Sequence, residues 1–106
     1  MAKYLLKASY TTDGVKGVLK DGGSSRRAAV EQTVQGLGGS LESFYFAFGD
    51  TDAYVVVDLP DNATAAAISM VVNAAGGAQV TTVPLMTPEE ADEATKKSVE
   101  YRPPGG

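Results

Sequence analysis

The chain has 106 residues, of which 43% are hydrophobic and 21% are charged, and its formal net charge is −4. This length suits a single domain with a modest core, and no apolar run approaches the roughly 20 residues that span a membrane. The sequence contains no cysteine, histidine or tryptophan, which excludes disulfides, thiolate nucleophiles, imidazole-based triads, and zinc or haem sites that need cysteine or histidine ligands.

The first predicted element is a strand at residues 3–11, where β-prone side chains dominate. Residues 13–21 have apolar side chains at helical spacing but also contain two glycines, so we predict a short or loose helix there. Gly22-Gly23 breaks that helix, and a second helix is predicted at residues 26–37 because one apolar stripe runs along it. Gly38-Gly39 should end it, since glycine readily adopts the left-handed conformation that closes many helices.

Two further strands are predicted at residues 40–48 and 53–59, with a four-residue turn between them whose composition is typical of a tight hairpin. The two strands are therefore expected to be antiparallel neighbours. A turn of four residues places Phe48 opposite Ala53 and sets the register of the whole hairpin. We expect Gly49 in this turn to take a positive φ.

The last part of the chain is predicted to contain a helix, a strand and another helix. An alanine-rich helix begins at residue 61 or 62 and ends at residue 73 or 75. A strand follows at residues 78–86, and Pro84 indicates that this strand lies at an edge or bulges near its end. Thr87-Pro88-Glu89-Glu90 combines a capping residue, an early proline and a glutamate at the third helical position. These features predict a terminal helix that extends to about Glu100.

The order of these elements, β-α-β-β-α-β with a terminal helix, predicts a small α+β domain in which helices cover one face of a sheet. We assign residues 1–87 to this domain. Residues 88–102 form the terminal helical segment, which packs either on the domain or on a partner subunit, and residues 103–106 are a flexible tail.

The predicted sheet has two unlike faces, because side chains alternate along each strand. One face is almost wholly apolar and is expected to meet the helices; it carries Phe44, Phe46, Phe48, Val55, Val57 and Leu59, and the predicted register sets Phe46 opposite Val55, Phe44 opposite Val57 and Glu42 opposite Leu59. The other face mixes aromatic, small and ionisable side chains, which is typical of a surface that a second copy covers.

A cavity between two such faces would have a polar lining of five side chains, which are Lys7, Ser9, Tyr45, Tyr54 and Asp58. We name these five as candidate ligand-binding residues. The interpretation that we prefer is structural: they satisfy one another across a homodimer interface, with Lys7 and Asp58 paired in charge, because buried ion pairs are more often structural than catalytic.

Arg26 and Arg27 follow a glycine-rich break and form a second candidate site. Free amides at a helix start beside two guanidinium groups are suited to a small anion, and six of the nine basic residues lie in the first thirty positions. The preferred interpretation is a helix break with two solvated arginines. A third interpretation pairs the two arginines with the acidic terminal helix of a neighbouring subunit.

The stretch from Ser43 to Asp61 resembles the GYD domain family, and the likeness covers most of the chain. It extends to Thr11–Gly14, to the Ser-Arg-Arg stretch at residues 25–27, to the strand Thr81-Thr82-Val83 and to residues 87–90. The resemblance implies a ferredoxin-like fold of the dimeric α/β-barrel type with an antiparallel four-stranded sheet, and no established activity. The Gly-Tyr-Asp motif of the family corresponds here to residues 49–52, where threonine replaces the tyrosine.

The turn at residues 49–52 has a structural and a functional interpretation. In the first, Asp50 and Asp52 accept hydrogen bonds from backbone amides. In the second, the two carboxylates hold a cation, which we disfavour because they supply far fewer than the six or more oxygens that calcium prefers.

Three functions are compatible with the sequence. The protein is a binding or regulatory module for a small, anionic molecule, or an assembly module, or a cofactor-free isomerase or monooxygenase-like enzyme with Asp58 as base and Tyr45 or Tyr54 polarising a carbonyl. We prefer a binding or assembly module that acts as a homodimer or higher homo-oligomer through the sheet face, because only analogy of fold supports the enzyme. We predict no cofactor, no metal, no nucleic-acid or membrane partner and a cytoplasmic location.

Overall fold

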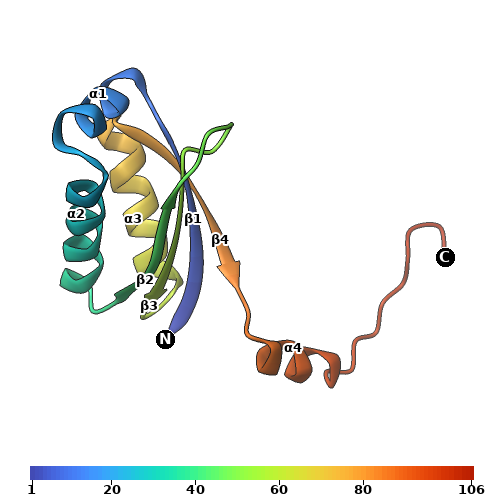
Figure 1. Cartoon of the computed structure of the whole chain (residues 1–106). Helices are drawn as coiled ribbons and strands as arrows, with labels where there is room; N and C mark the ends of the chain where they lie inside the picture. Colours follow the sequence, from blue (N-terminus) through green and yellow to red (C-terminus); the bar gives the residue numbers. More distant parts are fainter.

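A computed structural model describes all residues from 1 to 106 and shows a sheet with three helices on one face and a fourth helix set apart (Figure 1). The strands are β1 (Ala2–Tyr10), β2 (Ser40–Phe46), β3 (Ala53–Leu59) and β4 (Ala78–Leu85). The helices are α1 (Thr12–Asp21), α2 (Gly23–Gly36), α3 (Asn62–Ala75) and α4 (Pro88–Thr95). The strands are antiparallel in the order β2-β3-β1-β4. This arrangement confirms the predicted α+β class and is consistent with a ferredoxin-like fold.

Local capping signals set the ends of the helices as the sequence predicts. Thr11 and Asp61 each accept a hydrogen bond from the amide three residues ahead, at the starts of α1 and α3. Gly38 and Gly76 have φ of 82°, which closes α2 and α3 in the left-handed conformation. Gly22, with φ of 86°, is the single residue between α1 and α2, so α2 begins three residues earlier than predicted. None of the four helices combines the length and the apolar character that a membrane-spanning helix requires.

The core lies between the sheet and helices α2 and α3. Its largest fully buried side chains are Tyr4, Val34, Val57 and Leu59. Tyr4 also donates a hydrogen bond from its hydroxyl to the side chain of Asn62 at the start of α3. The inward positions of β1 and β3 thus hold the apolar residues that the alternating pattern predicts.

The register of the β2–β3 hairpin differs from the prediction by two residues. Phe46, and not Phe48, lies opposite Ala53. The connecting loop has six residues because the amide of Ala47 donates to the carbonyl of Asp52 (2.8 Å), whose own amide donates to Ala8 on β1 (2.8 Å). Phe48 therefore leaves the ladder and is fully exposed, and Gly49 has no positive φ.

A β-bulge at Glu42 changes the far end of the same ladder. The register shifts between Leu41 and Ser43, so that Leu41 lies opposite Val57 and Phe44 opposite Val55. The predicted pairings of Glu42 with Leu59 and of Phe44 with Val57 are therefore wrong. The extra residue of a bulge stands outside the regular pairing, and this leaves the side chain of Glu42 available for a contact on the other face.

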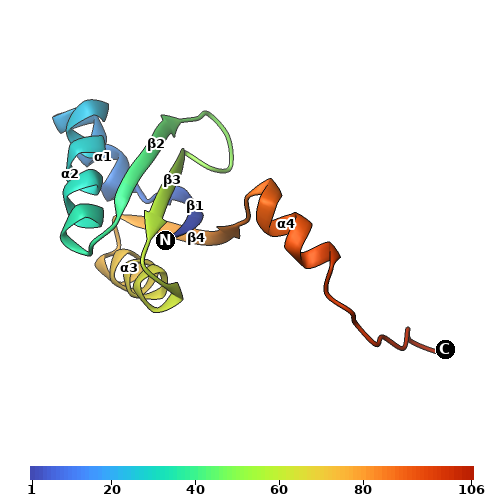
Figure 2. The same cartoon turned by 90° about the horizontal axis from the view of Figure 1, so that it is seen from below.

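The terminal helix α4 starts as predicted but ends earlier. Thr87 and Glu90 form a capping box, with Pro88 at the first helical position, and the helix ends at Thr95 rather than near Glu100. None of its residues is buried, and Figures 1 and 2 both show it apart from the other elements. Its packing on a partner subunit stays a prediction.

Candidate functional site

The face of the sheet that the helices do not cover is called the open face here, and it is built from all four strands (Figure 2). The pairing places its residues in rows that run from β2 to β4. The central row is Ser43, Val56, Leu5 and Val83; one flanking row is Tyr45, Tyr54, Lys7 and Thr81; the other is Ser40, Asp58, Lys3 and Leu85. An apolar row therefore crosses the open face between two rows that carry polar groups.

Lys7, Tyr45 and Tyr54 lie side by side in one flanking row. Tyr54 is paired with Lys7 on β1 and with Tyr45 on β2. Tyr45 is 70% exposed and Tyr54 is 40% exposed, so both rings offer apolar surface to the solvent. These three side chains, which the sequence predicted as candidate ligand-binding residues, form one continuous group.

Asp58 belongs to a different group at the other end of the open face. Lys3 Nζ lies 2.9 Å from Glu42 Oε2 and 3.1 Å from Asp58 Oδ1. Within the chain Asp58 thus pairs with Lys3 and not with Lys7, because the register sets Lys3 opposite Asp58. The pairing of Lys7 with Asp58 across a homodimer interface stays a prediction. Two hydrogen bonds raise the pKa of Lys3 above its usual 10.5. The bond to Glu42 has the larger effect, and the bond to Asp58 has the next largest. The side chains of the cluster are all partly exposed to solvent, so its contribution to stability is small.

The distance along β3 separates the two groups. Asp58 lies four residues from Tyr54, which is on the order of 13 Å at the rise of a strand. A carboxylate at one end and the two tyrosines at the other do not converge on the same atom of a small molecule.

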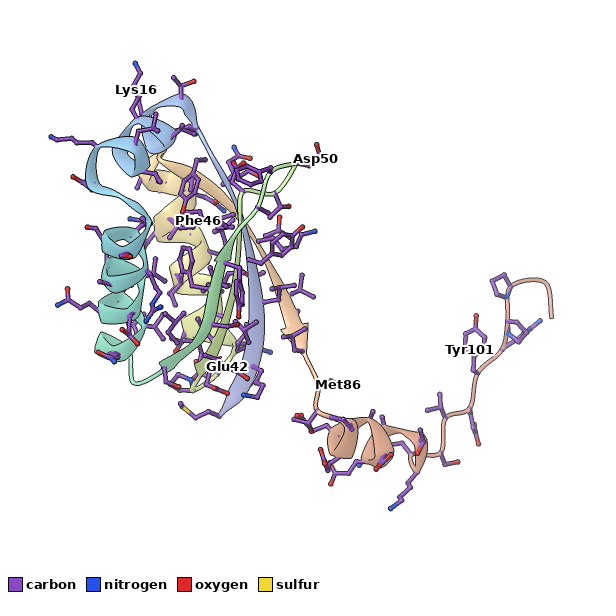
Figure 3. The ribbon with its side chains drawn as sticks, viewed as in Figure 1. Lys16, Glu42, Phe46, Asp50, Met86 and Tyr101 are labelled. Carbon is purple, nitrogen blue, oxygen red and sulfur yellow. The ribbon has the colours of Figure 1, made fainter.

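Ser9 and the 47–52 loop hold each other in place. Ser9 Oγ donates to the carbonyl of Asp50 (2.7 Å), and Asp52 Oδ2 accepts from the amide of Tyr10 (2.8 Å). The structural interpretation of the turn is confirmed for Asp52, whose carboxylate bonds to a backbone amide. Figure 3 shows Asp50 at the tip of this loop, away from the helices.

Arg26 and Arg27 lie on α2, which packs on the helix side of the sheet. Neither arginine forms a salt bridge. Arg26 borders a hollow below α2, whereas Arg27 borders a separate groove of about 260 Å³ along β2, together with Glu31, Glu42 and Tyr45. Of the other predicted residues, only Tyr45 therefore shares a space with one of the two arginines. The seven sequence-predicted residues thus do not form one site.

The hollow near Arg26 was not anticipated from the sequence. It has a volume of about 110 Å³, lies between α2, α3 and the sheet, and continues into an open groove of about 470 Å³ bordered by α1. The sequence does carry a signal for it, because three alanines line it, Ala29 on α2, Ala53 on β3 and Ala78 on β4. Small side chains at facing positions leave space.

Comparison with known proteins gives one match. A family model described as GYD domain matches residues 4–95, from β1 to the last residue of α4. No curated protein and no solved structure matches the chain.

Proposed function

The chain belongs to the GYD domain family, and we propose that it acts as a binding and assembly module whose open face meets the open face of a second copy. The observation that supports this proposal is the apolar row of Val56, Leu5 and Val83, which no helix of the chain covers. Burial of apolar surface is the main driving force of association.

The composition of the open face suits a homodimer. Tyrosines are enriched at interfaces because the ring is apolar and its hydroxyl keeps a hydrogen-bonding partner or water. In a twofold dimer the same patch serves both subunits, so Tyr45 and Tyr54 of each copy would flank the shared apolar row. The ammonium of Lys3 is already paired with Asp58 and Glu42, which reduces the penalty of covering it.

The C-terminal arm, residues 86–106, supplies a second contact in this proposal. Val99 and Tyr101 are 76% and 73% exposed and have no apolar surroundings in their own chain. We place residues 88–102, which comprise α4 and the segment that follows it, on the partner subunit, where these two side chains would be covered.

Lys7 gives the proposed dimer its binding function. It forms no ion pair within the chain and lies beside Tyr54, so a small anionic molecule held between the two faces would meet an ammonium and phenol hydroxyls. The enzyme alternative has no comparable support, because Asp58, its proposed base, is bonded to Lys3 and lies far from Tyr54.

The test is the oligomeric state of the full chain and of two variants, measured by sedimentation velocity. Tyr45→Lys adds a charge at an exposed position and is expected to convert the dimer into a monomer with an unchanged circular dichroism spectrum. Met70→Lys is the matched control, because Met70 is 67% exposed on α3, outside the open face. A native chain that is monomeric at micromolar concentration, or equal dissociation by both variants, would refute the proposal.

A further inference from the structure

The helices α2 and α3 do not close completely on the sheet. Of the fifteen residues around the hollow that remains between them, thirteen are hydrophobic, and the other two are Arg26 and Thr33. Tyr10 and Phe44 form part of its wall, and both rings are near that of Phe46, at centroid distances of 6.5 and 5.1 Å. Phe46, labelled in Figure 3, thereby holds two aromatic walls in place on the helix side of the sheet.

The hollow is apolar and small. Alanines at positions 29, 53 and 78 border it, where a larger aliphatic side chain would fill the space. Such a space forfeits packing contacts, and its apolar lining offers water few hydrogen-bonding partners. At about 110 Å³ the hollow is somewhat smaller than the cavity of on the order of 150 Å³ that admits benzene in another protein. An apolar group of a few carbons is therefore the occupant that its size and lining favour.

The hollow opens on one side into the groove between α1, α2 and the end of α3. Six residues border both spaces, which are Tyr10, Arg26, Ala29, Thr33, Val72 and Ala78. Glycines of α1 and of the connection to α2 keep the groove wide, because Gly17 and Gly22 present no side chain and have open space beside them. A molecule can therefore reach the hollow from the solvent without unfolding of the core.

Arg26 lies where the apolar hollow meets the polar groove. Its guanidinium carries up to five donors, and no salt bridge or side-chain hydrogen bond to the protein engages them. Asp21, the other charged residue at the groove, does not form an ion pair with it. The junction thus offers an uncompensated cation within reach of an apolar space.

We propose that the hollow and the groove bind a small carboxylic acid with a branched aliphatic tail, the tail in the hollow and the carboxylate on Arg26. A planar guanidinium suits a carboxylate because both can form two parallel hydrogen bonds. The same chemistry is present in a free acid and in an aliphatic amino acid, and the two differ at Asp21, which repels the first and attracts the ammonium of the second. This site is on the helix side and is independent of the open face.

The first experiment compares isocaproate with isocaproamide, which has the same tail and no charge, by calorimetric titration of the full native chain. We expect isocaproate to bind roughly tenfold more tightly, since a hydrogen bond to a charged group is stronger than one to a neutral group. Amide chemical shifts should change around Ala29 and Val72 and not on the open face. Equal affinities, or shifts confined to the open face, would overturn the proposal.

Variants separate the charge from the hollow. Arg26→Gln should reduce the affinity for isocaproate to that for isocaproamide, whereas Arg27→Gln, the adjacent arginine that borders a different groove, should leave both affinities unchanged. Ala29→Leu should abolish binding of both compounds by filling the hollow. Thermal melts of each variant without ligand show that it is folded. The same loss in Arg26→Gln and Arg27→Gln would contradict the assignment.

A second titration distinguishes the two sources of the carboxylate. If the ligand is an amino acid, leucine binds more tightly than isocaproate, and Asp21→Asn weakens the binding of leucine. If the ligand is a free acid, isocaproate binds more tightly than leucine, and Asp21→Asn strengthens the binding of isocaproate. Both outcomes support the site, and the absence of binding by either compound at millimolar concentration refutes it.

Discussion

Lys3 and Lys7 are four residues apart on β1 and point to the same face, yet only Lys3 meets carboxylates. The difference comes from the neighbouring strands. Lys3 is opposite Asp58 and within reach of Glu42, which a bulge releases from regular pairing, whereas Lys7 is opposite Tyr54. Strand register therefore leaves one ammonium neutralised and the other free for a ligand.

A single capping residue, Asp61, gives the stability of the protein a dependence on pH. Its Oδ1 accepts hydrogen bonds from the hydroxyl and the amide of Thr64 at 2.7 and 2.8 Å, and these bonds lower the pKa of Asp61 below its usual 3.8. Because the pKa is lower in the folded state than in the unfolded state, Asp61 stabilises the fold above pH 3.8, and this stabilisation is lost as the pH falls through the folded-state pKa.

Asp61→Ala should accordingly lower the midpoint of thermal unfolding at neutral pH, and the difference from the native chain should shrink below pH 3.8. Thermal melts followed by circular dichroism between acid and neutral pH measure this. Asp61→Asn is the control, because asparagine also caps helices but does not ionise; its melting point should show less dependence on acid pH. A deficit in Asp61→Ala that stays constant at every pH would contradict the mechanism.

Among the elements, α1 is fixed at its first turn. The amide of Thr11 donates to the carbonyl of Gly77 at 3.1 Å, and its hydroxyl donates to Gly76 at 2.8 Å. Gly14 lies so close to the same turn that an added Cβ would come within 1.8 Å of the oxygen of Gly77. An added Cβ at Gly17, one turn later, would have no atom within 4 Å apart from the backbone of its own helix.

This contrast predicts opposite effects of the same substitution at two positions of α1. Gly14→Ala should destabilise the protein by about 1–3 kcal/mol, the usual penalty of overpacking. Gly17→Ala should stabilise it by up to about 1 kcal/mol, because alanine favours a helix over glycine. Urea denaturation of both variants measures the free energy of unfolding. Two shifts of the same sign would show that the approach of α1 to Gly77 does not constrain the fold.

The elements also show what a sequence can reveal. Helix boundaries at Thr87, Gly38 and Gly76 were predictable because capping depends on residues that are close together in the chain. The hairpin register was not, because the amide of Asp52 bonds to Ala8, a partner more than forty residues away. The end of α4 was placed too late since nothing packs on this helix, and an isolated helix of fewer than about 12–15 residues is marginal.

The candidate sites show the same contrast between features set by residues close together in the chain and features set by distant residues. The membership of the open face followed from alternation along the strands, which is a local property. The partner of Asp58 and the hollow beside Arg26 did not, because each depends on which residues of distant elements meet and on the volumes of their side chains.

At the scale of the whole molecule, the C-terminal arm makes the chain longer than its body requires. The principal extents are 55, 33 and 23 Å, and the radius of gyration is 16.7 Å, against about 13 Å for a compact chain of this length. An arm without buried residues gives its own chain little stability. We therefore expect that its role is to contact another chain.

Removal of residues 87–106 should therefore separate folding from assembly. We expect the thermal midpoint of the monomeric body to change little, while the dissociation constant of the dimer, measured by sedimentation equilibrium, rises. Removal of residues 103–106 alone serves as the control and should alter neither quantity. A large loss of stability in the longer deletion, or an unchanged dissociation constant, would show that the arm has a different role.

The two edges of the sheet limit how large an assembly the proposed dimer can form. Pro84 on β4 has no amide hydrogen to offer to an added strand, and β2 is interrupted by the bulge at Glu42, which places a charge near its edge. Neither edge is a good template for strand addition, which is the route by which exposed sheets polymerise into fibrils. We therefore expect the proposed face-to-face association to stop at a discrete small particle, even in concentrated protein, instead of growing without limit.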